Sequence, residues 1–247
     1  ITGTSQNTYT SLTNTALFGE LDKDNLLKIG YESSQLTVTG SPQWDFLPGK
    51  KYDNGFLHNK FGIPRDKKLV LFATEVIEKR AMVSCYINLF NSISRIDNTV
   101  LIFKLHPSDP GHYIDDIASK TNFSGEYYIF KNNLHEAIHL SDVLLNFQSS
   151  VTIDAIIMGK PVIAINFSGR LARSPYANYD PIITVTEENE LFSKIKYVLN
   201  DKSFENYYRK YRADFIRKFC YKADGNSSKR VSKLINRLVT SRVEVNG

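Results

Sequence analysis

From Leu69 onward, the sequence alternates short apolar runs with amphipathic stretches, and this rhythm constrains the fold more than any other feature. The apolar runs are LVLFAT, TVLIFKLH, EYYIF, DVLLNF, PVIAINF and PIITVT. Between them lie stretches with helical spacing, and in ENELFSKIKYVL the apolar side chains share one helix face. Strands that are apolar throughout and alternate with helices are typical of a parallel sheet covered on both faces. The sequence therefore predicts an α/β, Rossmann-like fold with helices on both faces of a parallel sheet.

The segment before this rhythm has a different texture, since it is polar and rich in turn residues. We therefore expect a boundary near residue 66. Residues 67–247 would form the Rossmann-like domain together with the C-terminal helices, and residues 1–66 would form a separate part.

Charge is unevenly distributed along the chain. Residues 201–247 hold 12 Lys and Arg against 5 Asp and Glu, a net charge of +7, and the remaining 19 against 21 give −2. The basic residues alternate with apolar ones at helical spacing, which is typical of solvated amphipathic helices. The alternative is a basic surface that binds anionic lipid or a polyanionic acceptor. No DNA- or RNA-binding motif accompanies the charge, so nucleic acid is not an expected partner.

The remaining bulk features favour the cytoplasm. No apolar run reaches the roughly 18 residues that a membrane span requires, and the first residues lack the pattern of a signal peptide. The two cysteines, Cys85 and Cys220, fit neither a disulfide framework nor a zinc pattern, which favours a reducing compartment. Peripheral association with the inner face of the cell membrane, through the basic C-terminal helices, is the alternative location.

The run TVLIFKLH places a lysine and a histidine at the end of a predicted buried strand, and Pro107 ends the strand. Ligands of parallel sheets bind at the carboxyl ends of the strands. Lys104 and His106 lie two residues apart and should share a face, and a buried lysine needs a carboxylate partner or an anionic ligand. His106 could donate to a phosphate oxygen, act as a general acid or base, or be a structural histidine.

A second polar cluster follows the run DVLLNF. Ser149, Ser150 and Thr152 stand where a strand turns directly into a helix, and the first amides of a helix lack partners within it. Such amides, together with hydroxyl groups, make an anion site. The competing interpretation is that Ser149 or Ser150 is only a helix cap, with Asp154 completing a capping arrangement.

Other familiar site patterns are absent or weak. His135 and His139 fit the HExxH order, but the predicted helix is short and no third ligand follows, so we expect no metal site. No GxGxxG, GxxxxGK[ST] or GxSxG motif occurs, which argues against a dinucleotide fingerprint, a P-loop or a serine hydrolase elbow.

Taken in order, VTGSPQWD, KLHP, SDVLLNFQSSVTIDAIIMGKPVIAIN and DGNSSKRVSKLI resemble the C-terminal, donor-nucleotide-binding domain of GT-B glycosyltransferases. The resemblance covers about residues 36–235. The most similar members are bacterial surface-polysaccharide sialyl- and Kdo-transferases and CDP-glycerol glycerophosphotransferases. It implies that residues 1–66 are the tail of an N-terminal acceptor domain plus a linker, and that the chain holds one half of a GT-B fold.

The resemblance also implies roles for individual residues. The donor's phosphates would be held by Lys104, His106, Pro107, Ser149, Ser150 and Thr152. The ribose or base would be contacted by Asp154, Asn132, Asn133 and Glu75. No metal or other cofactor is then expected, because donors at the helix start would stabilise the departing nucleotide. The catalytic base is not identified in this chain and normally comes from the N-terminal domain.

The expected function is therefore that of a nucleotide-sugar glycosyltransferase of surface polysaccharide or glycan biosynthesis, of which this chain would be the donor-binding half. Its donor would be CMP-, UDP- or CDP-linked and its acceptor a glycan or a lipid-linked glycan. Alone it would bind nucleotide and transfer nothing. The alternatives are a CDP-glycerol-type glycerophosphotransferase, a sugar-nucleotide 2-epimerase-like protein, and a non-catalytic module that binds nucleotide or membrane.

Overall fold

The computed structural model describes residues 14–147, 149–167, 176 and 178–245 of the chain. They form two compact units: residues 51–212 in one, and residues 14–50 with 213–245 in the other. The boundary that the sequence suggests, at residue 66 with the C-terminal helices joined to the sheet domain, stays a prediction. Helix α8 (Lys202–Cys220) runs through the boundary between the units. None of the described helices combines the length and the apolar content that crossing a membrane requires.

The larger unit is built on a six-stranded parallel sheet with the order β5-β4-β3-β6-β7-β8. The strands are β3 (Lys68–Ala73), β4 (Thr99–Lys104), β5 (Glu126–Phe130), β6 (Val143–Asn146), β7 (Val162–Ile165) and β8 (Ile183–Val185). The apolar side chains of the inner strands β4 and β6 are buried on both faces. The predicted α/β, Rossmann-like parallel sheet is confirmed, because burial on both faces is what their continuous apolar runs require.

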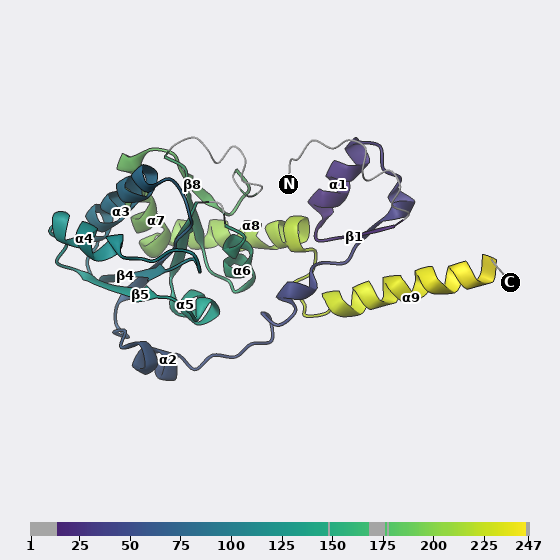
Figure 1. The fold of residues 1–247 in the computed structure, drawn as a ribbon, viewed down its shortest axis with the longest axis horizontal. Helices are drawn as coiled ribbons and strands as arrows, with labels where there is room; N and C mark the ends of the chain where they lie inside the picture. The colour runs from purple at the N-terminus through teal and green to yellow at the C-terminus, as the bar shows by residue number, and fades with distance from the viewer. Residues whose placement is uncertain (1–13, 148, 168–175, 177, 246–247) are drawn as a thin grey trace. The chain divides into compact units, whose positions relative to one another are not determined.

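Helices cover both faces of this sheet (Figure 1). On one face α3 (Lys79–Ile93) packs against α4 (Tyr113–Lys120) and α7 (Leu191–Asn200). On the other, α5 (Leu134–Leu140) contacts β3 and β4, and α6 (Val151–Ile157) contacts β6 and β7. Helix α2 (Asn54–Phe61) packs on α5. The chain winds outward from β3 through β4 to β5 and then returns to β6, so the strand order reverses between β3 and β6.

The smaller unit contains a two-stranded parallel sheet, β1 (Thr15–Leu17) paired with β2 (Leu36–Val38), and helix α1 (Glu20–Lys28). Its last element is α9 (Ser227–Val245). Asp45, from the turn after β2, accepts hydrogen bonds from the backbone N–H groups of Ser227 and Ser228 at 2.8 and 2.7 Å. A carboxylate far away in the sequence therefore caps the N-terminus of α9.

Candidate functional site

The reversal of strand order brings the two predicted phosphate-binding segments to one edge of the sheet. Strands β4 and β6 both pair with β3, so the residues that follow these strands lie at the same carboxyl edge. Neighbouring strands lie about 4.8 Å apart, which places the ends of β4 and β6 about 10 Å from each other. In open α/β sheets this reversal point is where ligands bind.

His106 lies at this edge with an exposed side chain, two residues beyond the end of β4. Its backbone N–H donates to the Thr74 hydroxyl at 2.9 Å, and its ring Nδ1 accepts from the Ser108 N–H at 3.2 Å. Because an N–H can only donate, Nδ1 must be the acceptor, and the neutral ring carries its hydrogen on Nε2. The histidine thus offers a hydrogen-bond donor at Nε2. Pro107 follows it and is exposed.

Lys104 is buried, whereas His106 is exposed at the edge of the sheet. The Lys104 ammonium donates to the carbonyl oxygens of Leu105 and Lys131 at 2.6 and 3.2 Å. Two backbone carbonyls thus engage two of the three ammonium donors, and contact with a donor phosphate stays a prediction. Burial lowers the pKa of Lys104.

Ser149 and Ser150 form the turn between β6 and α6. The Ser149 side chain is half-buried, and Ser150 is exposed. The Val151 N–H approaches the Ser149 hydroxyl at 3.4 Å, while the N–H groups of Thr152 and Ile153 donate to the carbonyls of Ser149 and Ser150. The prediction of several unpaired amides here was wrong, since the turn itself accepts from three of them. Anion binding at this turn would depend chiefly on the two serine hydroxyls.

Thr152 is turned into the protein rather than toward the edge. It is 2% exposed, and its hydroxyl accepts from the Asn146 side chain at 2.9 Å. Asn146 is the last residue of β6, and sequence reasoning did not select it. The signal was present, because a wholly buried amide ends an otherwise apolar run. This bond ties the start of α6 to the end of β6.

The residues predicted for the ribose and base lie on helix α6 and after strands β5 and β3. The Asp154 carboxylate lies 3.0 Å from Nε2 of His135, so it joins α6 to α5 instead of completing the expected capping arrangement. Asn132 and Asn133 are exposed in the turn between β5 and α5, where Asn133 has a positive φ of 63°. Glu75 is half-buried and directly follows Thr74 at the end of β3.

The HExxH histidines have separate partners. His135 faces Asp154, whereas Nε2 of His139 contacts the Asn54 side chain and its ring stacks on Tyr52 with the centroids 4.5 Å apart. Among the residues that the structure describes, no group of three or more His, Cys, Asp or Glu side chains is arranged to hold a metal ion.

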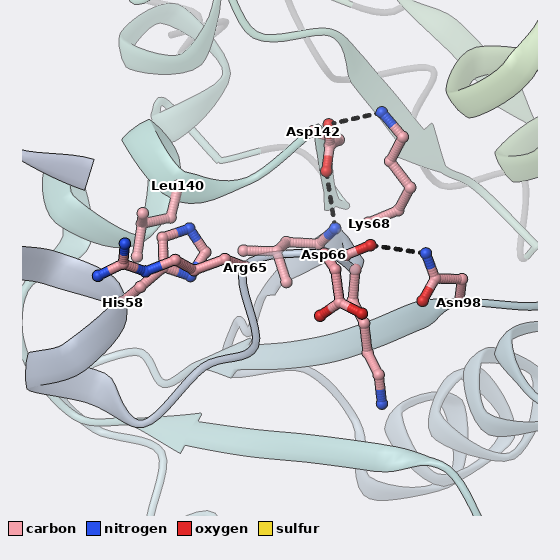
Figure 2. Close-up of a pocket in the computed structure, with 9 residues that line it drawn as sticks. His58, Arg65, Asp66, Lys68, Asn98, Leu140 and Asp142 are labelled. Atoms are coloured by element: carbon pink, nitrogen blue, oxygen red, sulfur yellow. Dashed lines mark hydrogen bonds and ion pairs between the residues drawn. The ribbon is translucent and has the colours of Figure 1, made fainter. Parts of the chain in front are cut away.

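A pocket of about 290 Å³ lies at the amino edge of the sheet, beside the starts of β3 and β6 (Figure 2). Figure 2 shows how its polar groups engage one another: Asp142 accepts from the Leu69 N–H at 2.8 Å and from Lys68 at 3.3 Å, and the Asn98 amide donates to the Asp66 carbonyl at 2.6 Å. These contacts anchor the strand starts, which explains the polar lining without a ligand.

A sequence profile of the CDP-glycerol:poly(glycerophosphate) glycerophosphotransferases matches residues 24–237, most of the chain. The chain belongs to this family. No curated protein matches the chain. The profile includes both predicted phosphate-binding segments, which agrees with the expectation of a nucleotide-dependent transferase domain.

Solved structures of similar fold come from two kinds of protein. The wall teichoic acid polymerase TagF matches with a TM-score of 0.60 at 18% identity, over 93% of this chain and 59% of that one. A putative UDP-N-acetylglucosamine 2-epimerase from Listeria monocytogenes matches with a TM-score of 0.65 at 19% identity, over 89% of this chain and 57% of that one. S. aureus MnaA with UDP matches with a TM-score of 0.66 at 16% identity, over 92% of this chain and 60% of that one. At these identities the likeness shows the fold alone. The chain spans less than two thirds of the length of each of these proteins.

Proposed function

We propose that this chain is the donor-binding part of a nucleotide-dependent transferase and that its donor is CDP-glycerol. The family match over residues 24–237 carries the proposal, and it favours the CDP-glycerol alternative over a nucleotide-sugar donor. The geometry supports a phosphate site at the carboxyl edge, because the exposed imidazole of His106 and the hydroxyls of Ser149 and Ser150 follow two strands that flank β3.

In the proposed reaction an acceptor hydroxyl attacks the phosphorus atom that carries glycerol, and the bond from that phosphorus to CMP breaks. Negative charge then grows on the departing CMP. Nε2–H of His106 and the two serine hydroxyls would donate to its phosphate oxygens, and donors already in place stabilise such charge without a metal. A separate group has to take the proton of the acceptor hydroxyl.

Calorimetry with CDP-glycerol, CDP, CMP, UDP and UDP-N-acetylglucosamine tests the proposal. We expect the cytidine ligands to bind, and the variants His106→Ala and Ser149→Ala/Ser150→Ala each to lose about 1–3 kcal/mol of binding free energy, the value of a charge-assisted hydrogen bond. His58→Ala and Ser94→Ala, at the amino edge, are the controls and should bind as the wild type does.

The alternatives predict different results from the same titrations. A preference for UDP-N-acetylglucosamine would support an epimerase-like protein, in line with the fold likeness to the 2-epimerases. Unchanged affinity in both site variants would refute the phosphate site. Nucleotide binding that never leads to transfer, even with an added acceptor domain, would indicate a non-catalytic module.

The acceptor and the location belong to the same proposal. We infer a cytoplasmic protein that meets a glycan or lipid-linked acceptor at the inner membrane face. The support is the basic charge of residues 201–247, which suits an anionic acceptor or an anionic lipid surface.

A further inference from the structure

The turn that carries His106 is closed by its own backbone and by one carboxylate. The Asp109 N–H donates to the His106 carbonyl at 2.9 Å, and the Asp109 side chain accepts from the Gly111 N–H, also at 2.9 Å. Gly111 has a φ of +72°, and a Cβ at this position would lie 2.6 Å from the Leu105 side chain. The segment after β4 is therefore a tightly fixed turn.

Two side chains from outside this turn hold its two ends. The Thr74 hydroxyl accepts from the His106 N–H at 2.9 Å, and the Tyr86 phenol donates to the second Asp109 oxygen at 3.4 Å. The direction of the bonds is fixed, because an amide can only donate and a carboxylate can only accept. Together with the bond from the Asp109 N–H to the His106 carbonyl, these two contacts fix both ends of the turn.

Both side chains are protected from solvent. Tyr86 is 1% exposed and Thr74 is 4% exposed. The Tyr86 ring packs against Phe72 and Phe103, with centroid distances of 5.7 and 5.1 Å. Burial and the nearby Asp109 raise the pKa of Tyr86, so it stays a neutral donor. Hydrogen bonds in such surroundings reinforce one another, and an unpartnered group would be costly.

We propose that Tyr86, Thr74 and Asp109 are positioning residues, which hold the His106 turn so that Ser108 N–H remains on Nδ1 and the donor Nε2–H is directed to the ligand. This inference rests on the proposed function, in which His106 binds a donor phosphate. None of the three residues touches the nucleotide. Tyr86 comes from helix α3, and no motif in the sequence connects it with the histidine.

The test uses Tyr86→Phe and Thr74→Val, which each remove one hydroxyl and nearly preserve side-chain volume. We expect each to weaken binding of CDP about five- to tenfold, the equivalent of one hydrogen bond, and Thr74→Ser to restore it. Tyr208→Phe is the matched control, since this tyrosine is also buried and donates to the Lys160 carbonyl at 3.0 Å. It should lose similar thermal stability and keep its affinity.

Nitrogen-15 NMR of the His106 ring, without nucleotide, gives an independent readout. The wild type should show the tautomer with hydrogen on Nε2, and Tyr86→Phe and Thr74→Val should show a mixture. A mixture in the wild type, or wild-type spectra in both variants, overturns the positioning role whether or not nucleotide binds. Absence of nucleotide binding by the wild type with the expected spectra overturns the proposed function instead.

Discussion

Lys104 shows how a buried cation can be stabilised without an opposite charge. Its ammonium bridges the carbonyls of Leu105 and Lys131, which lie beyond the ends of the neighbouring strands β4 and β5. Carbonyl dipoles can replace a carboxylate because the group keeps charge-assisted hydrogen bonds. The residue thereby joins the turn that carries His106 to the turn that carries Asn132 and Asn133.

Replacing this lysine separates its structural role from the predicted phosphate contact. We expect Lys104→Met to lower the free energy of unfolding by about 1–3 kcal/mol, because two carbonyls lose a charged donor, and to leave affinity for CDP nearly unchanged. Urea unfolding and calorimetry on the same sample measure the two effects. A large loss of affinity with little loss of stability would instead support direct contact with phosphate.

At the scale of elements, helix α9 depends on a cap supplied from elsewhere in the chain. Burial tends to raise the pKa of Asp45, but the hydrogen bonds from Ser228 and Ser227 outweigh this and lower it to about 2. A carboxyl group whose folded pKa lies below its unfolded value stabilises the fold above the unfolded pKa, and the stabilisation disappears as the pH falls through the folded pKa. The cap is therefore complete at neutral pH.

We expect Asp45→Asn to lower the free energy of unfolding by about 1 kcal/mol at pH 7, the usual value of a helix cap. Below about pH 4 the difference from the wild type should shrink, and it should nearly vanish close to pH 2. Denaturant titrations at several pH values give this difference. A difference that stays constant from pH 7 to pH 3 would show that the carboxylate charge is not what matters.

The elements were predictable from the sequence to a greater degree than the site. Strands buried on both faces must be apolar throughout, so β4 and β6 could be located by inspection. The partners of Lys104, the inward direction of Thr152 and the contact between Tyr86 and Asp109 could not be predicted, because each depends on contacts that only the fold brings together. Asn146 is an intermediate case. The sequence shows an amide at the end of an apolar run, but it does not show that Thr152 is its partner.

At the scale of the whole molecule, the charge distribution suggests where an anionic surface would bind. Lys233 and Arg237 are exposed on α9 and line a groove with β2 residues Thr37 and Val38. Within the part of the chain that the structure describes, neither of the two basic side chains forms an ion pair. Each basic residue near an anionic membrane contributes about 1 kcal/mol of binding free energy.

Vesicle flotation tests this proposal. We expect the protein to float with vesicles rich in phosphatidylglycerol at low salt, to be released by high salt, and not to float with phosphatidylcholine. Lys233→Glu/Arg237→Glu should abolish flotation, whereas Lys120→Glu/Lys196→Glu, with the same net charge, should reduce it less. Equal loss in both double variants would mean that total charge, and not α9, governs the interaction.

The hydrogen bond from Ser108 to Nδ1 of His106 also limits the part that this histidine can take in the reaction. The nitrogen that lacks hydrogen is engaged by the turn, so the ring has no unoccupied position at which to receive a proton from an incoming hydroxyl. Through Nε2–H it can only donate a hydrogen bond to an atom that gains negative charge, because losing that hydrogen would leave an imidazolate. His106 is therefore suited to the departure of the leaving group, and activation of the nucleophile must come from another residue.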